Sequence, residues 1–141
     1  MTDCEVIQGV FPREILGRVD LRERMVRQQL RAPIRQPARI AQVLAYAHCI
    51  QRAIERGEYR DCSDVAQRLG YTKARISQMM NLTLMAPSIQ EEVLSLESVD
   101  GLEPMGEHAV RVVSEERDWA AQRARWEPMA AAHQRLFHLS R

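Results

Sequence analysis

The chain has 141 residues, a length that fits one domain with an additional arm, and its few aromatic residues favour a core of aliphatic side chains on helices. The formal net charge is only +1, but it is unevenly distributed: residues 87–118 carry nine acidic and two basic side chains, whereas the stretches on either side are net basic. A near-neutral total therefore does not exclude a nucleic-acid-binding face, because binding responds to the local patch.

The cysteines argue against a disulfide-bonded or zinc-binding protein, and the hydropathy pattern argues against a membrane protein. Cys4, Cys49 and Cys62 are odd in number and widely spaced, which argues against a disulfide framework and against a zinc site. We expect reduced thiols, with Cys49 in the core. No apolar run approaches the roughly 20 residues that a membrane helix needs, and the N-terminus lacks a signal-peptide pattern. The sequence thus predicts a cytoplasmic protein with no membrane partner.

Residues 1–36 are predicted to form an arginine-rich arm or amphipathic helix. Six arginines fall between Arg13 and Arg31, interleaved with apolar residues. One interpretation is contact with DNA phosphates or entry into a minor groove, by Arg22, Arg24, Arg27, Arg31, Arg35 and Arg39. Asp20 and Glu23 interrupt the basic run, however, so an ordinary amphipathic helix explains the pattern equally well.

A long helix is predicted after Pro37, which suits a first helical turn, and Gly57 provides its C-terminal stop. One face of this helix is apolar, with Ile40, Val43, Leu44, Ala47, Ile50 and Ile54. The helix opens a predicted DNA-binding domain that covers residues 37–118.

The stretch "DVAQRLGYTKARISQMMNL", residues 64–82, has the features of a helix-turn-helix. Such a motif needs small or apolar residues where the helices cross, and a turn residue that tolerates a positive φ, here Gly70. Ser63 and Thr72 stand where N-caps of the two helices belong. The predicted inward face holds Val65, Ala66, Leu69, Ile76 and Met79.

The outward side of the second helix, residues 72–82, carries side chains suited to reading DNA. Arginine pairs with guanine through two N–H groups, glutamine and asparagine pair with adenine, and hydroxyl groups contact phosphates or bases. Because the N-terminal part of a recognition helix enters the major groove, we expect the first contacts from residues 73–78. The predicted DNA-binding residues are Thr72, Lys73, Ala74, Arg75, Ser77, Gln78 and Asn81, with Ser63, Arg35 and Arg39 as candidate contacts to the DNA backbone.

Two further helices are predicted before the tail, one restarting at Pro87 with the apolar stripe Ile89, Val93 and Leu94, and one over "EHAVRVVSEERDW". The acidic side chains nearby fit no calcium loop, so we expect a solvated face turned away from DNA. They are Glu91, Glu92, Glu97, Asp100, Glu103 and Glu107.

The tail, residues 119–141, is predicted to be helical. Trp119 and Trp126 are seven apart and so share one side of a helix, together with Met129, Leu136 and Phe137. This stripe is either core packing or the interface of a homodimer, and a dimer would double the contact with DNA over two half-sites.

No catalytic residue, metal site or other cofactor is predicted. The four histidines are His48, His108, His133 and His138, and none has a partner at a metal-ligand spacing. We expect His108 to contribute to packing. Because no nucleophile and base are visible together, an enzyme is not expected.

The stretch "DVAQRLGYTKARISQMMNLTLMAPSIQEEVL" resembles the central helix-turn-helix of ParB/KorB-type DNA-binding proteins. In that family the recognition helix runs into a leucine-rich segment, a proline and a helix beginning with an Ile/Val-Gln-Glu pattern. The later "GEHAVRVV" is similar to the Gly-His-Ala segment that follows in the family. The resemblance covers about residues 60–115 and implies sequence-specific DNA binding, commonly as a dimer or on repeated sites.

The chain also departs from that family. ParB proteins normally carry an N-terminal nucleotide-binding domain with a Gly-Glu-Arg-Arg-like motif, which this sequence does not show, so a nucleotide-gated partition clamp is not expected. The tail "ERDWAAQRARWEPM" resembles that of short helix-turn-helix proteins encoded with site-specific recombinases. This second resemblance implies an accessory or regulatory role, with a recombinase as candidate partner.

The sequence therefore predicts an all-α, multi-helix bundle with a central, ParB/KorB-like helix-turn-helix. The predicted function is sequence-specific binding of double-stranded DNA, as a regulator or accessory factor of a plasmid, phage or other mobile element. Helices of this kind also occur in modules that never touch DNA. The alternative is a protein-interaction module that docks a recombinase or polymerase and uses the helix-turn-helix as a scaffold.

Overall fold

The computed structural model describes residues 22–27 and 29–138, which divide after Pro33 into two units. In the first unit, residues 22–27 and 29–30 are helical, as expected for the arm, and Met25, Val26 and Leu30 are exposed. The part of the predicted arm before residue 22 lies outside the described residues, as does Cys4.

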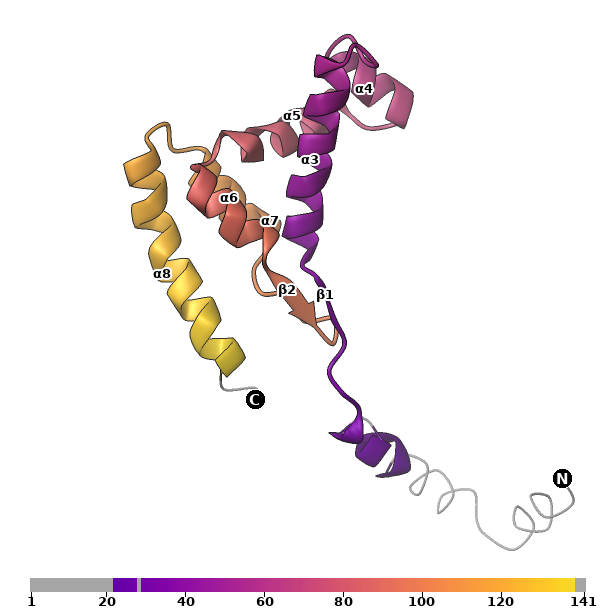
Figure 1. The fold of residues 1–141 in the computed structure, drawn as a ribbon, viewed down its shortest axis with the longest axis vertical. Helices are drawn as coiled ribbons and strands as arrows, with labels where there is room; N and C mark the ends of the chain where they lie inside the picture. Colours follow the sequence, from indigo (N-terminus) through magenta and orange to yellow (C-terminus); the bar gives the residue numbers. More distant parts are fainter. Residues whose placement is uncertain (1–21, 28, 139–141) are drawn as a thin grey trace, which may run out of the picture. The chain divides into compact units, whose positions relative to one another are not determined.

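The second unit, from Ile34 onward, is mostly helical, which confirms the predicted class (Figure 1). A short antiparallel sheet pairs two three-residue strands, with Arg35 opposite Val99 and Pro37 opposite Glu97. The elements in chain order are β1 (Arg35–Pro37), α3 (Arg39–Glu55), α4 (Cys62–Leu69), α5 (Lys73–Asn81), the 3-10 turn η1 (Leu82–Leu84), α6 (Pro87–Leu94), β2 (Glu97–Val99), α7 (Glu107–Ser114) and α8 (Trp119–His138).

Helix α3 is the central element, because its apolar face supplies both parts of the core. Ile40 and Leu44 pack into the cluster formed with η1, α6, α7 and α8, whereas Ala47 and Ile50 pack into a second cluster formed with α4 and α5. The predicted face is confirmed, and the helix ends before Gly57, whose φ is +77°. The helix starts later than expected.

The expected role of Pro37 and the expected place of Cys49 were wrong. Pro37 lies in β1, and α3 begins at Arg39 after Ala38, whose backbone N–H donates to the carbonyl of Leu96 at 2.8 Å. Pairing with β2 thus extends the chain through Pro37 and postpones the helix. Cys49 is exposed, because it lies on the side of α3 away from both clusters.

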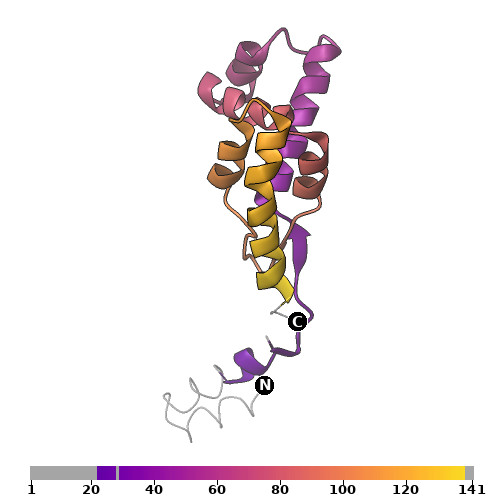
Figure 2. The same cartoon turned by 90° about the vertical axis from the view of Figure 1, so that its left-hand side faces the viewer.

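Helix α8 packs against α6 and α7 (Figure 2). Trp126 is 2 % exposed, and its indole N–H donates to the carboxylate of Glu92 at 2.6 Å. The side-chain amide oxygen of Gln122, also buried, accepts from the backbone N–H of Ala86 at 2.7 Å, in the segment that leads into α6. The described part of the predicted tail therefore belongs to the same core as α3.

The two tryptophans do not share one environment. Trp119 is 50 % exposed at the first residue of α8, while Trp126 and the partly buried Met129 join the core. Core packing, one of the two expectations for the stripe, thus holds for Trp126 and Met129. The side chains of Leu136 and Phe137 lie outside the described residues.

Candidate nucleic-acid interface

Helix α4 begins with a side-chain cap at Asp61, two residues before the expected one. The Asp61 carboxylate accepts from the backbone N–H of Asp64 at 2.9 Å, and the Asp64 carboxylate accepts from the backbone N–H of Arg60 at 3.0 Å. Asp61 is the N-cap, and Ser63 lies inside the first turn of the helix. The prediction for Ser63 as N-cap was wrong. The spacing Asp-x-x-Asp, which resembles a capping box, was the signal that would have found the correct start.

The turn between α4 and α5 confirms the predicted roles of Gly70 and Thr72. Gly70 ends α4 with φ +75° and ψ 23°, a left-handed conformation that glycine adopts without a steric penalty. Thr72 is extended, and its hydroxyl accepts from the backbone N–H of Arg75 at 3.1 Å, which caps the start of α5. The two helices are therefore joined by a short, conformationally defined link.

We expect Gly70→Ala to lower the free energy of unfolding by about 1 kcal/mol, because an L-residue with a Cβ is strained at positive φ. An added Cβ at residue 70 would meet no other heavy atom within 4 Å, so the loss would come from the backbone conformation alone. Urea unfolding measures it. Gly70→Asn is the matched control and should lose less, since asparagine tolerates the left-handed region. Equal losses in the two variants would contradict this explanation.

Helix α5 has one buried and one exposed side. Ile76 and Met79 pack with Val65 and Ala66 of α4 in the second core cluster, as predicted. Leu69 was predicted to face inward but is 38 % exposed, because it stands in the last turn of α4 where the core ends. Opposite the buried side, Lys73, Ala74, Ser77 and Asn81 are exposed and Gln78 is partly exposed.

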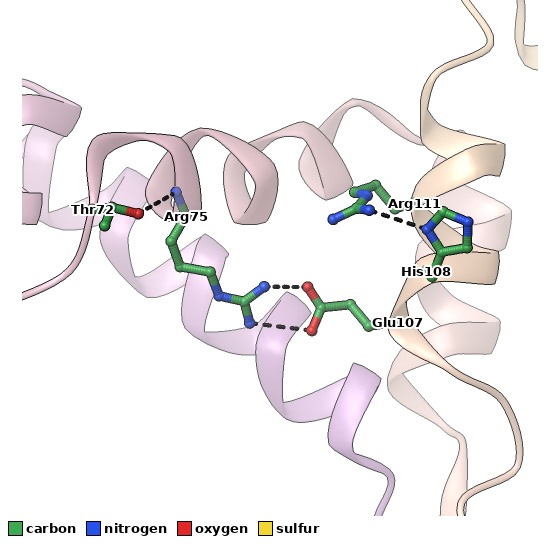
Figure 3. Close-up of polar contacts among 5 residues, drawn as sticks. All are labelled: Thr72, Arg75, Glu107, His108 and Arg111. Carbon is green, nitrogen blue, oxygen red and sulfur yellow. Dashed lines mark hydrogen bonds and ion pairs between the residues drawn. The ribbon is translucent and has the colours of Figure 1, made fainter.

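Arg75 leaves this exposed row and pairs with Glu107 of α7. Its two Nη atoms donate to the two carboxylate oxygens of Glu107, and the bond from Nη2 to Oε2 is 3.1 Å long (Figure 3). The Arg75 side chain keeps 33 % of its accessible area and that of Glu107 keeps 25 %. A bidentate pair of this kind links α5 to α7 and occupies the end of the guanidinium with which Arg75 would contact DNA.

Glu107 is the electrostatic centre of this contact. The hydrogen bond from Arg75 is the main cause that lowers the pKa of its carboxyl group, and the positive charges of Arg75, Arg111 and Arg39 lower it further. The same hydrogen bond raises the pKa of the Arg75 guanidinium. Both groups are therefore charged near neutral pH.

The pair should make stability depend on pH in the acid range. Because the pKa of Glu107 is lower in the folded than in the unfolded chain, its contribution is complete above the ordinary value of 4.5 and is lost as the pH falls through the lowered pKa. We expect Glu107→Gln to cost about 1 kcal/mol at pH 7, a modest value because solvent screens the pair. At pH 3 the difference in free energy of unfolding between Glu107→Gln and the unaltered protein should be smaller. Urea unfolding at the two pH values checks this, and an undiminished difference at pH 3 would contradict it.

The three candidate backbone contacts are not gathered at α5. Arg35 lies in β1, where its guanidinium forms an ion pair with Glu97 at 3.1 Å, and Arg39 is exposed at the start of α3. Ser63 is exposed in α4, a helix that lies beside the other end of α3 (Figure 1). The 17 residues of α3 make a helix roughly 25 Å long, with Arg39 at its first turn and α4 following its last.

The acidic residues were expected to form a solvated face turned away from DNA, and Glu91, Glu92, Glu97, Asp100 and Glu103 are exposed as expected, whereas Glu107 is partly buried. Glu107 lies against α5 rather than away from it, Glu92 binds Trp126, and Glu97 pairs with Arg35. The Asp100 carboxylate accepts from the backbone N–H of Ile34 at 3.0 Å, and the Glu103 carboxylate accepts from the backbone N–H of Arg39 at 2.9 Å. The carboxylates of Glu97, Asp100 and Glu103 thus help to hold the two-stranded sheet and the start of α3 in place.

His108 and His48 each take part in a polar contact with a neighbouring side chain. His108 is exposed, and its Nδ1 accepts from Nη2 of Arg111 at 3.1 Å, so the expectation that it contributes to packing was wrong. Nε2 of His48 lies 2.7 Å from Oε1 of Gln90 and links α3 to α6. Across the described residues, no group of three or more His, Cys, Asp and Glu side chains could hold a metal ion.

Comparisons of the chain with protein-family models, with curated proteins and with solved structures find no match. Within the described part of the chain, none of the helices is both long enough and apolar enough to cross a membrane.

Proposed function

We propose that the protein binds double-stranded DNA in a sequence-specific manner and inserts α5 into the major groove. The observation that carries this proposal is the exposed row on α5, which consists of Lys73, Ala74, Ser77, Gln78 and Asn81. These residues follow one another at positions that share a side of the helix. Among the described residues, the side chains of Ser77, Gln78 and Asn81 have no hydrogen-bond partner, so their polar groups remain available to a ligand.

The side chains of this row have the chemistry that contacts base edges and phosphates in DNA. Gln78 and Asn81 can each offer a donor and an acceptor to adenine, and Lys73 can contact guanine or a phosphate. Ala74 leaves room for close approach of the helix and can contact a thymine methyl group. The buried side of α5 and the cap at Thr72 hold these groups in a fixed arrangement.

The resemblance to ParB/KorB-type proteins supports the same function, with binding as a homodimer or on repeated sites. We infer a regulator or accessory factor of a plasmid, phage or other mobile element, acting in the cytoplasm, with a recombinase as a candidate partner. In this proposal the protein is not an enzyme and needs no cofactor.

The decisive experiment selects bound sites from a random pool of DNA duplexes. We expect one enriched sequence, and a palindrome would report a two-fold dimer. If no sequence is enriched and binding stays weak even at low salt, the proposed function is wrong.

A protein-interaction module remains the second candidate, and the exposure of Trp119 favours it, since exposed tryptophan is frequent at interfaces. A pull-down with a recombinase tests this second function. It is supported if the Ser77→Glu protein still binds the recombinase and the Trp119→Ala protein does not.

A further inference from the structure

Arg75 and Glu107 join the start of α5 to the start of α7. Arg75 is in the first turn of α5, and Glu107 is the first residue of α7, 32 positions later in the chain. Figure 3 shows the Arg75 side chain extending from α5 to the Glu107 carboxylate, with Arg111 of α7 directed toward the same region. The pair has no net charge, so it adds little attraction for a phosphate.

Glu107 is held by more than Arg75. It lies in the first turn of α7, where the helix dipole favours a negative charge. Arg111 and Arg39 add positive charge near it. An incoming phosphate would therefore have to compete with a well-stabilised carboxylate for the guanidinium of Arg75.

We propose that Glu107 is a specificity-determining residue, which neutralises Arg75 and so prevents it from binding DNA phosphates irrespective of sequence. This inference rests on the proposed function. Phosphate contacts strengthen binding to all duplexes, whereas base contacts distinguish among them. By removing one phosphate contact, the Glu107 carboxylate lowers the affinity for unrelated DNA. The exposed row on α5 then distinguishes one DNA sequence from another.

The test compares Glu107→Gln with Glu91→Gln by measuring affinity for the selected duplex and for an unrelated duplex at several salt concentrations. Glu91 is exposed on α6 and none of the described residues binds its carboxylate, so its variant controls for the change in net charge. With Glu107→Gln we expect affinity for the unrelated duplex to rise roughly fivefold near 0.1 M salt, and the slope of log affinity against log salt to steepen by about 0.9. Glu91→Gln should change neither quantity by a comparable amount.

A second pair of variants tests whether Glu107 acts through Arg75. In a protein that already carries Arg75→Gln, the Glu107→Gln change should no longer steepen the salt dependence, because the released guanidinium is missing. Thermal unfolding of each variant confirms that the proteins compared are folded.

The outcomes separate this inference from the function on which it rests. If the unaltered protein selects a sequence but Glu107→Gln weakens binding or matches Glu91→Gln, then Glu107 only braces α5 and the inference is wrong. A steeper slope that persists in the Arg75→Gln background also overturns it. If the unaltered protein binds no duplex at low salt, the proposed function fails, and the role of Glu107 fails with it.

Discussion

Replacement of Ser77 by glutamate is expected to lower the affinity for the selected DNA at least roughly 100-fold, since like charges brought together at an interface cost several kcal/mol. Ser77 lies in the middle of the exposed row on α5, so in the proposed complex the new carboxylate would face base-edge acceptors and flanking phosphates. Titration of a labelled duplex measures the loss.

Ser88→Glu provides the matched control for this variant. Ser88 is an exposed serine of α6, so the substitution adds the same charge to a helix outside the exposed row. We expect Ser88→Glu to bind DNA nearly as well as the unaltered protein. Because glutamate favours a helix at least as much as serine does, both variants should fold. Equal affinities of Ser77→Glu and the unaltered protein would exclude α5 as the reading helix.

Trp126→Ala should produce the largest loss of stability, about 3–5 kcal/mol, as is typical when a large buried aromatic side chain is truncated. The change would leave a cavity between α8 and the core formed by α3 and α6, and it would remove the indole donor to Glu92. Chemical unfolding followed by circular dichroism measures the effect.

Trp119→Ala is the control on the same helix, with the same substitution at a side chain that is half exposed. In a monomer we expect its stability to change by less than about 0.5 kcal/mol, as at ordinary surface positions. If Trp119 instead contributes to a homodimer, the loss will grow with protein concentration. If Trp126→Ala and Trp119→Ala lose the same stability at low protein concentration, burial of Trp126 does not explain the loss.

The structure agrees with the sequence wherever one local feature specified the backbone. The apolar period predicted the buried side of α3, since Ile40 and Leu44 recur on one helical face. Gly70 and Thr72 were predicted because a left-handed turn and an N-cap each depend on one residue and its immediate neighbours. Pro87 likewise begins α6.

The failures arose where a local pattern had more than one solution. Ser63 and Asp61 are both acceptable caps, and a neighbouring carboxylate, that of Asp64, favours Asp61. Pro37 suits a helix start and also an edge strand, and β2 provides the partner that selects the strand.

The sequence by itself determined the helical class, the helix-turn-helix and the outward polar row of its second helix, because period, turn and cap are properties of short segments. Only the tertiary structure decided that Arg75 is bound to Glu107, that Trp126 is buried while Trp119 is exposed, and that Cys49 faces solvent. The physical reason is that a helical period defines a face without specifying what covers it. The partner of Arg75 lies on another helix, and only folding brings the two together.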